Sequence, residues 1–193
     1  MSITVHQRPG VYSTYDASTV VSGSGSGKLV GLAAINTVAP AGQAQTITSY
    51  DKAVAVFGSA GGEDMAELIR LILKNGASGV AAVPVEDESG YEAAFELLAG
   101  LEDLALVVCD STQESVQQKL KESVMSASEL RRERLGVVAG GAGESVEELT
   151  ARAKNLNCER MILVAPGCVD QEGESLTGIS LAAAVAGAIA GES

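Results

Sequence analysis

From residue 28 onward, the chain repeats one pattern, in which a short uninterrupted apolar stretch alternates with a helical pattern. Three of the helical patterns begin with Ser-x-x-Glu, whose two side chains satisfy the free N–H groups of a first helical turn. These pairs are Ser89/Glu92, Ser111/Glu114 and Ser145/Glu148. The apolar stretches predict strands at Leu29–Ile35, Val80–Val85, Leu104–Cys109, Leu135–Ala139 and Met161–Val164. Such an alternation predicts an α/β fold with an open, mostly parallel sheet and helices on both faces.

Apolar spacing gives each predicted helix one side that faces the sheet. Ser49 caps a short helix through Phe57, and a second helix runs from about Glu63 to Asn75. A last helix of small residues extends from Leu176 to about Ala190. The inward positions expected in the last three helices are Val116, Leu120 and Val124, then Val146, Leu149, Ala153 and Leu156, then Ile179, Ala183, Ala186 and Ile189.

The charge of the chain restricts its partners. Among 193 residues, 25 acidic and 13 basic side chains give a formal net charge of −12. A field of this sign repels phosphate, so we expect no nucleic-acid partner and no docking on an anionic membrane. The three cysteines show no CxxC spacing and the chain has one histidine, which makes a His/Cys zinc site very unfavourable. We therefore expect reduced, structural cysteines, no metal and no cofactor.

The first 27 residues differ from the rest of the chain. Ile3-Thr4-Val5 and Val11-Tyr12-Ser13-Thr14-Tyr15 favour extended structure, with Pro9-Gly10 between them. Alternating serine and glycine over residues 22–27 predict a flexible linker. The sequence thus predicts two parts, an extended N-terminal arm with its linker over residues 1–27 and an α/β domain over residues 28–193. Because the arm alone buries little apolar surface, it lies across its own domain or pairs with something else.

Motifs for enzymatic chemistry are weak. Gly27-Lys28 lacks the earlier glycine and the following Ser or Thr of a phosphate-binding loop. Gly140–Gly143 follows a predicted strand and precedes a helix, a place for an anion or a dinucleotide, but a tight turn explains it better. Asp110 and Ser111 end a strand where α/β enzymes hold catalytic groups, and they serve equally well as helix caps. The one histidine, His6, lies on the arm, so we expect no Ser-His-Asp triad and no enzyme.

Two charged clusters each have a simple interpretation and a functional one. Glu86-Asp87-Glu88 offers carboxylates to a cation, although a solvated loop is the stronger interpretation. Arg131, Arg132 and Arg134 lie between a predicted helix and a predicted strand. We interpret them as a surface turn, with an ionic contact to a partner as the alternative.

Several segments resemble a known family when they are taken in order. Arg8-Pro9-Gly10-Val11-Tyr12 is followed by Ile47-Thr48-Ser49-Tyr50-Asp51 and then by Val56-Phe57-Gly58. The later segments are 71–77, 80–85, 157–167 and 182–191. In this order and register, the chain resembles the contractile phage tail sheath family over nearly its whole length.

The resemblance implies a structural subunit of a contractile tail, in a phage, a prophage or an R-type bacteriocin (tailocin). Sheath subunits polymerise around an inner tube and contract, which drives the tube through a cell envelope. The implied partners are neighbouring copies of the chain, and the implied location is the tail particle, after synthesis in the host cytoplasm. Family members add strands from terminal arms to an adjacent subunit's sheet. The arm residues expected to make this exchange here are Ile3, Thr4, Val5, Val11, Tyr12 and Tyr15.

The chain departs from the family pattern at its end. Sheath proteins continue past the small-residue helix into a C-terminal domain that faces the tube, whereas this sequence stops at Ser193. We therefore expect that domain, with its contact to the inner tail tube protein, to be absent from this chain. The alternative function is a small-molecule-binding or hydrolytic α/β domain, which predicts a polar pocket near Asp110, Gly140–Gly143 and Pro166–Gly167.

Overall fold

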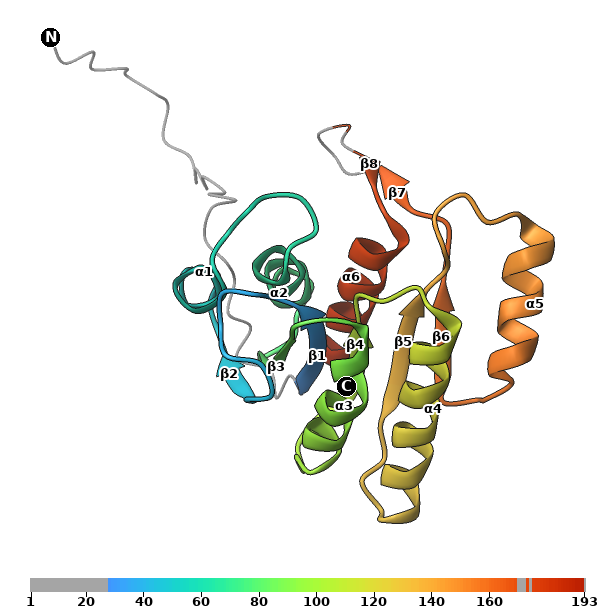
Figure 1. The fold of residues 1–193 in the computed structure, drawn as a ribbon, viewed down its shortest axis with the longest axis horizontal. Helices are drawn as coiled ribbons and strands as arrows, with labels where there is room; N and C mark the ends of the chain where they lie inside the picture. Colours follow the sequence, from blue (N-terminus) through green and yellow to red (C-terminus); the bar gives the residue numbers. More distant parts are fainter. Residues whose placement is uncertain (1–27, 170–172, 174, 193) are drawn as a thin grey trace, which may run out of the picture.

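The computed structural model describes residues 28–169, 173 and 175–192. Within them, six strands form one sheet in the order β2-β3-β1-β4-β5-β6 (Figure 1). Five of these strands run parallel, and β2 pairs with β3 in the antiparallel sense. The bounds are β1 Leu29–Ile35, β2 Gln45–Ile47, β3 Gly79–Val85, β4 Leu104–Cys109, β5 Leu135–Ala139 and β6 Met161–Val164. The predicted α/β fold and all five predicted strands are confirmed.

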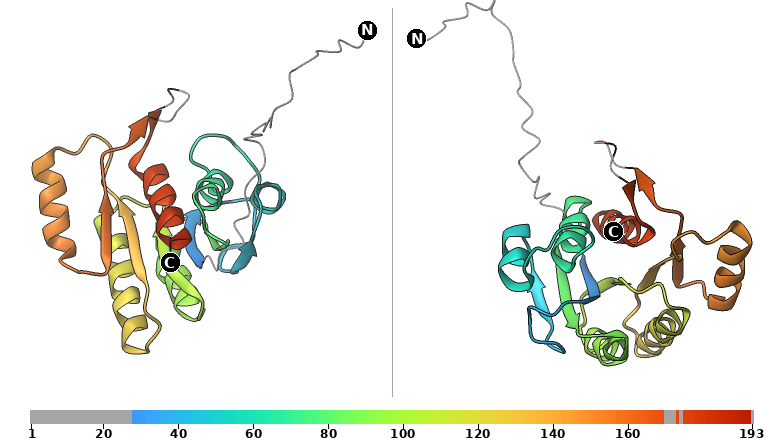
Figure 2. Two further views of the ribbon diagram at one scale, coloured as in Figure 1. Left: turned by 180° about the vertical axis from the view of Figure 1, so that it is seen from behind. Right: turned by 45° about the horizontal axis from the view of Figure 1, so that its top comes forward.

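Helices cover both faces of the sheet (Figure 2). One layer holds α1 (Tyr50–Phe57), α2 (Met65–Lys74) and α6 (Gly178–Gly191). The other layer holds α3 (Tyr91–Ala99) and α4 (Glu114–Glu129), with α5 (Val146–Leu156) at the β6 end of the sheet. Among the described residues, no helix combines the length and the apolar character needed to cross a bilayer.

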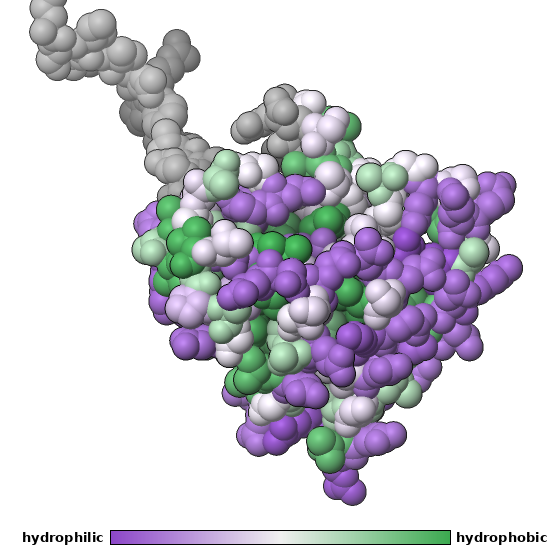
Figure 3. All heavy atoms as spheres, in the orientation of Figure 1, coloured by the Kyte–Doolittle hydropathy of each residue, from purple (hydrophilic) through white to green (hydrophobic). Residues whose placement is uncertain are grey.

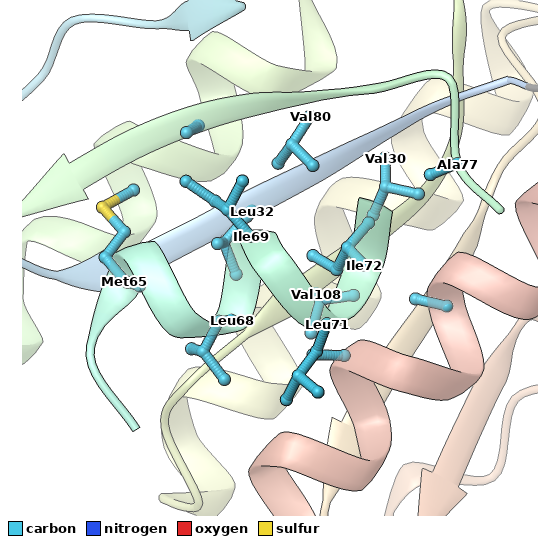
Figure 4. Close-up of a cluster of buried hydrophobic side chains, with 14 of the residues drawn as sticks. Val30, Leu32, Met65, Leu68, Ile69, Leu71, Ile72, Ala77, Val80 and Val108 are labelled. Atoms are coloured by element: carbon cyan, nitrogen blue, oxygen red, sulfur yellow. The ribbon is translucent and has the colours of Figure 1, made fainter. Parts of the chain in front are cut away.

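The larger core lies between the sheet and the layer of α1, α2 and α6. In Figure 4, Ile69 and Ile72 of α2 lie near Leu32 of β1 and Val108 of β4, and Leu68 belongs to the same cluster. All five side chains are fully buried. Burying a side chain of this size contributes about 1.5–3 kcal/mol to stability. This cluster therefore supplies a large share of the free energy of folding.

Glycines bring α6 unusually close to α2. A Cβ added to Gly187 would collide with the carbonyl oxygen of Ile72. At the end of the two helices, a Cβ on Gly191 would lie 3.1 Å from the Cα of Gly76. The small-residue helix therefore packs backbone against backbone, and a side chain at Gly187 would push the two helices apart.

Capping follows the sequence prediction at two helices and departs from it at two others. Ser49 caps α1, and Ser145 with Glu148 forms a complete capping box at α5. The Ser89/Glu92 box is wrong, because Asp87 accepts the Ser89 N–H and caps a short 3-10 turn, Glu88–Gly90, that precedes α3.

The Ser111/Glu114 box is also wrong. The Ser111 hydroxyl oxygen accepts the N–H of Gln113 at 3.2 Å, and α4 begins only at Glu114. The Glu114 carboxylate instead accepts from the side-chain amide of Asn155 at 3.3 Å. The serine therefore closes a local turn before the helix. A serine side chain that bonds to the backbone of such a turn is not available to cap the helix.

The inward face predicted for α5 is largely wrong. Val146 is 75% exposed and Ala153 is exposed, whereas Leu156 and the charged Arg152 are buried. By contrast, the predicted faces of α4 and α6 hold, since Val116, Leu120, Val124, Ala183 and Ala186 are buried. Figure 3 shows mainly hydrophilic residues over the α4 and α5 side of the molecule.

Three short strands were not predicted. One is β2, and the other two, β7 (Cys168–Val169) and β8 (Ser175–Leu176), pair in the antiparallel sense. In Figure 1, this pair projects beyond the body of the fold between β6 and α6. The predicted arm and linker, residues 1–27, lie outside the described residues.

Candidate functional site

The strand order marks one place where an α/β sheet of this kind usually binds a ligand. The chain turns from β1 toward β3 on one side and from β4 toward β5 on the other. Ligands of such sheets lie in the crevice at this switch point, at the carboxyl ends of the strands. Here that position falls beside Ile35, at the end of β1, and Asp110, directly after β4. This is one of the positions that the alternative function requires.

Asp110 fills the switch point with contacts to its own chain. Its carboxylate accepts the N–H of Ile35 at 2.9 Å and the hydroxyl of Tyr91. Tyr91 begins α3, is fully buried and packs its ring 5.8 Å from that of Phe95. Asp110 therefore joins the ends of two neighbouring strands to the first turn of α3. Its predicted role as a helix cap is wrong.

The protonation of this pair follows from burial. Burial raises the pKa of Asp110, although the hydrogen bonds from Tyr91 and Ile35 act in the opposite direction. Burial also raises the pKa of Tyr91, and the nearby Asp110 charge raises it further. Tyr91 thus remains a hydrogen-bond donor at neutral pH. Next to it, Cys109 is fully buried with a pKa raised to about 12, so its thiol is not a nucleophile at neutral pH.

Asn36, just past β1, also uses its side chain for hydrogen bonds to the backbone of its own chain, as Asp110 does. Its side-chain oxygen accepts the N–H groups of Val38 at 3.0 Å and Ala39 at 2.9 Å. Its side-chain nitrogen donates to the carbonyl of Phe57, at the end of α1, at 2.9 Å. Both sides of the switch point are thereby tied to the scaffold. In the described part of the chain, every buried side-chain N or O atom has a hydrogen-bond partner.

The glycine turn after β5 is filled by a polar network between α4 and α5. Arg152, buried on α5, forms an ion pair with Glu144. It also donates to the carbonyl of Thr112 at 2.9 Å and to the side-chain oxygen of Gln117 at 3.2 Å. Gln117 is fully buried and donates to the carbonyl of Ala139, the last residue of β5, at 2.8 Å.

The side chains of this network occupy the turn at which an anion or a dinucleotide would bind. The hydrogen bond from Arg152 lowers the pKa of Glu144, and Glu144 raises the pKa of Arg152. A Cβ on Gly141 would lie 2.7 Å from a Glu144 carboxylate oxygen. The glycines thus make room for the Glu144 side chain, which agrees with a tight turn.

The arginines between α4 and β5 are not a simple surface turn. Arg134 is only 3% exposed, and its guanidinium donates to the carbonyls of Leu98 at 2.7 Å and Leu101 at 2.9 Å. Arg132 donates to the carbonyl of Ala99 at 3.2 Å. Together they donate hydrogen bonds to carbonyls at the carboxyl end of α3. Their positive charges also interact favourably with the negative end of the helix dipole there. Burial lowers the pKa of Arg134.

Two shallow hollows lie elsewhere. One, of about 260 Å³, separates the first turns of α2 and α6, where Glu63 accepts hydrogen bonds from Thr177 and Ser180. The other, of about 250 Å³, lies at the amino ends of β4 and β5, between Lys28 and Arg160. Within the described residues, no three potential metal ligands form a group, and Glu86-Asp87-Glu88 is a solvated loop and turn.

The predicted site residues have different outcomes. Asp110, Ser111, Gly140–Gly143 and Pro166–Gly167 all follow the carboxyl ends of strands, and at the first three the local contacts are internal. The arm residues Ile3, Thr4, Val5, Val11, Tyr12 and Tyr15 lie outside the described residues, so their role stays a prediction. Sequence reasoning missed Arg152, whose one signal was its helical spacing between Leu149 and Leu156.

Comparison with solved structures finds the same fold in tail sheath proteins. A sheath tail protein of Desulfitobacterium hafniense matches 94% of this chain with a TM-score of 0.67 at 14% identity. The sheath tail protein Lin1278 of Listeria innocua matches 87% with a TM-score of 0.65 at 14% identity. The helical sheath of the anti-feeding prophage in its contracted state matches 97% with a TM-score of 0.59 at 18% identity.

These likenesses cover only part of the matched proteins. The chain spans 62%, 57% and 54% of their respective lengths. No family model matches the sequence, and no curated protein does. At these low identities the likeness is one of fold, and it confirms the fold expected from the resemblance.

Proposed function

We propose that this chain, which has the fold of tail sheath proteins, is a structural subunit of a contractile tail sheath. The observation that carries the proposal is the match over 87–97% of the chain to three sheath proteins, one of them in a contracted helical sheath. In this proposal, subunits assemble around an inner tube and contract to drive the tube through a cell envelope. The particle is a phage tail or a related contractile particle such as a tailocin, made in the cytoplasm of a bacterial host.

The proposed partners are neighbouring copies of the chain and the inner tail tube protein. Contact with a neighbour is proposed to run through the arm over residues 1–27, whose strand-prone segments add main-chain hydrogen bonds to another sheet. The tube is reached through the part of sheath proteins that this chain does not span. The body from residue 28 is the proposed α/β sheath domain.

The proposed role is not enzymatic. At the switch point of the sheet, Asp110 is bound by Ile35 and Tyr91. At the turn after β5, Glu144 is bound by Arg152. A hydrolytic or ligand-binding site needs polar groups that are free to face a substrate. These groups instead hold strands and helices together, which suits a subunit that must transmit mechanical force.

Light scattering of the purified chain tests the proposal. The intact chain is compared with a variant that lacks residues 1–22, and we expect assemblies larger than a dimer only for the intact chain. Replacing Val11 and Tyr12 by aspartate should have the effect of the deletion, because charge opposes strand addition. The matched control places aspartate at Ser18 and Thr19, outside the strand-prone segments. The same number of chains per assembly for the intact chain and the deletion variant would contradict a linking role for the arm.

A further inference from the structure

The sequence holds one Asn-Gly dipeptide, Asn75-Gly76, at the end of α2. An asparagine before glycine is prone to lose its side-chain amide, because glycine has no side chain to hinder attack by its backbone nitrogen. The other asparagines, Asn36, Asn155 and Asn157, precede threonine, leucine and cysteine. Both residues of the Asn-Gly pair are exposed, so water reaches the reacting groups.

The reaction needs only the chain and water. The backbone nitrogen of Gly76 attacks the side-chain carbonyl carbon, Cγ, of Asn75, so that a C–N bond forms and the Cγ–Nδ2 bond breaks. The Gly76 amide proton passes to hydroxide or water, and Nδ2 takes up a proton and leaves as ammonia. Water then opens the cyclic succinimide at either carbonyl carbon, which gives aspartate or isoaspartate. In isoaspartate the main chain runs through Cβ and Cγ and is therefore longer.

The end of α2 holds the pair away from this reaction. Asn75 has a ψ of 4°, which turns the Gly76 nitrogen toward the Asn75 backbone nitrogen and away from the Asn75 side chain. The Gly76 N–H donates to the carbonyl of Leu73 at 3.2 Å, and the Asn75 side-chain nitrogen donates to that of Leu71 at 2.8 Å. Ring closure requires rotation about the ψ angle of Asn75, and this rotation breaks the Gly76 hydrogen bond.

Helix α6 packs directly on the same pair. Figure 2 shows α2 and α6 side by side. A Cβ added to Gly187 would lie 3.0 Å from the Cβ of Asn75, and one added to Gly76 would lie 3.2 Å from the Cα of Gly191. Contacts this close leave little room for Asn75 to rotate while α6 is in place.

We propose that Asn75 is a site of non-enzymatic deamidation, and that separation of α6 from α2 controls its rate. In the packed state, the hydrogen bonds of the turn and the backbone of α6 keep the Gly76 nitrogen away from Cγ. In the open state, Asn75 reacts as it does in an unfolded chain. Segments of a fold open locally with free energies below that of global unfolding. The proposal does not depend on whether the chain forms a sheath.

The products do not fit the packed helices. Isoaspartate lengthens the main chain next to Gly76, where the backbone of Gly191 leaves no space. Both products also lack the Nδ2 donor that binds the carbonyl of Leu71. Because repacking of α6 does not reverse the reaction, modified chains record past opening of the contact between α2 and α6.

Peptide mapping by mass spectrometry, after incubation in mildly alkaline buffer, measures the reaction at Asn75. We expect the folded parent protein to deamidate at least about tenfold more slowly than the same chain in urea. Gly187→Ala places a methyl group against Asn75 and the Ile72 carbonyl, and it should raise the rate in the folded protein about tenfold. Arg152→Met is the matched control, because it destabilises the fold at α5 and leaves α6 unchanged. It should keep the parent rate, and thermal unfolding checks that both variants fold.

Hydrogen exchange of the parent protein gives a second test that needs no variant. The Gly76 amide should exchange through an opening that costs less free energy than global unfolding, seen as a weaker dependence of its exchange on urea. Exchange of this amide by global unfolding alone would overturn local control by α6.

The mapping experiment can overturn each part of the proposal. Deamidation as fast in the folded parent protein as in urea would show that the turn gives no protection. Equal acceleration by Gly187→Ala and Arg152→Met would show that global unfolding controls the rate. An unmodified Asn75 in urea would show that the pair is not a reactive site.

Discussion

Helices α6 and α5 cover the same sheet, α6 over its centre and α5 at its β6 end (Figure 2). Six residues of α6 are buried, and its Gly187 backbone touches α2. Only two residues of α5 are buried, and one of them is Arg152, held by Glu144 and Gln117. The centre is therefore held by close packing of apolar and backbone atoms, whereas the outer helix is held largely by polar contacts. We therefore expect a substitution that changes side-chain volume to destabilise the centre most. A substitution that removes a charge should destabilise the outer helix most.

The largest effect should come from breaking the close packing at the centre. Gly187→Leu places a side chain against the Ile72 carbonyl, and it should lower the free energy of unfolding by about 3 kcal/mol or more. Chemical denaturation measures the loss. Ala188→Leu, at the next and exposed position of the same helix, is the matched control and should change little. Similar losses in both variants would contradict the close approach of α6 and α2.

The polar contacts of the outer helix give the second effect. Arg152→Met keeps the length of the side chain but leaves Glu144 and Gln117 without their donor. The expected loss in unfolding free energy is about 2 kcal/mol. Lys119→Met, which removes an exposed ion pair with Glu92, should make no measurable difference. If Arg152→Met were as stable as the parent protein, α5 would be held by its apolar contacts instead.

The half-buried Asp110 carboxylate between the strand ends gives a smaller effect that depends on pH. Because the pKa of Asp110 is raised in the folded state, its contribution to stability is complete below about pH 3.8 and is lost as pH rises through the folded pKa. Asp110→Asn removes this loss and retains an acceptor for the Ile35 N–H. The stability of the variant relative to the parent should therefore increase from pH 4 to pH 7, as measured by urea unfolding at several pH values. A relative stability that falls with pH would show that Asp110 is stabilised in its charged form.

The smallest effect should be at Val146, on the outward side of α5. Val146→Ala should change the free energy of unfolding by less than about 0.5 kcal/mol, because the side chain is already 75% exposed. Leu156→Ala, on the buried side of the same helix, should lower it by about 2 kcal/mol. Equal losses at the two positions would restore the inward face that the apolar spacing predicted.

The same contrast separates what the sequence could predict from what it could not. All five long strands and the inner face of α4 could be predicted from local apolar patterns. In these elements the apolar residues of the pattern are the ones that pack against neighbouring strands and helices. The face of α5 does not follow, since a helix beside an edge strand has less apolar surface to cover. The short strand β2, with polar Gln45 and Thr46, carries too little pattern to be distinguished from a loop.

The candidate site was predictable in position but not in role. Asp110 and the glycine turn lie where strand ends were expected. Their contacts join residues far apart in the chain, such as Asp110 with Ile35, 75 residues earlier. No local pattern reports such a contact. The same holds for Arg134, which reaches the end of α3, 36 residues before it.

The central place of α6 has a consequence for how the protein is made. It is the last helix of the described chain, yet it packs against β1, β4, β5 and α2 in the middle of the domain. Until residues 178–191 have left the ribosome, the side of α2 that faces α6 and the parts of β1, β4 and β5 that α6 covers have no partner. A nascent chain of this domain must therefore avoid aggregation with an apolar area of the sheet uncovered until α6 can pack against it.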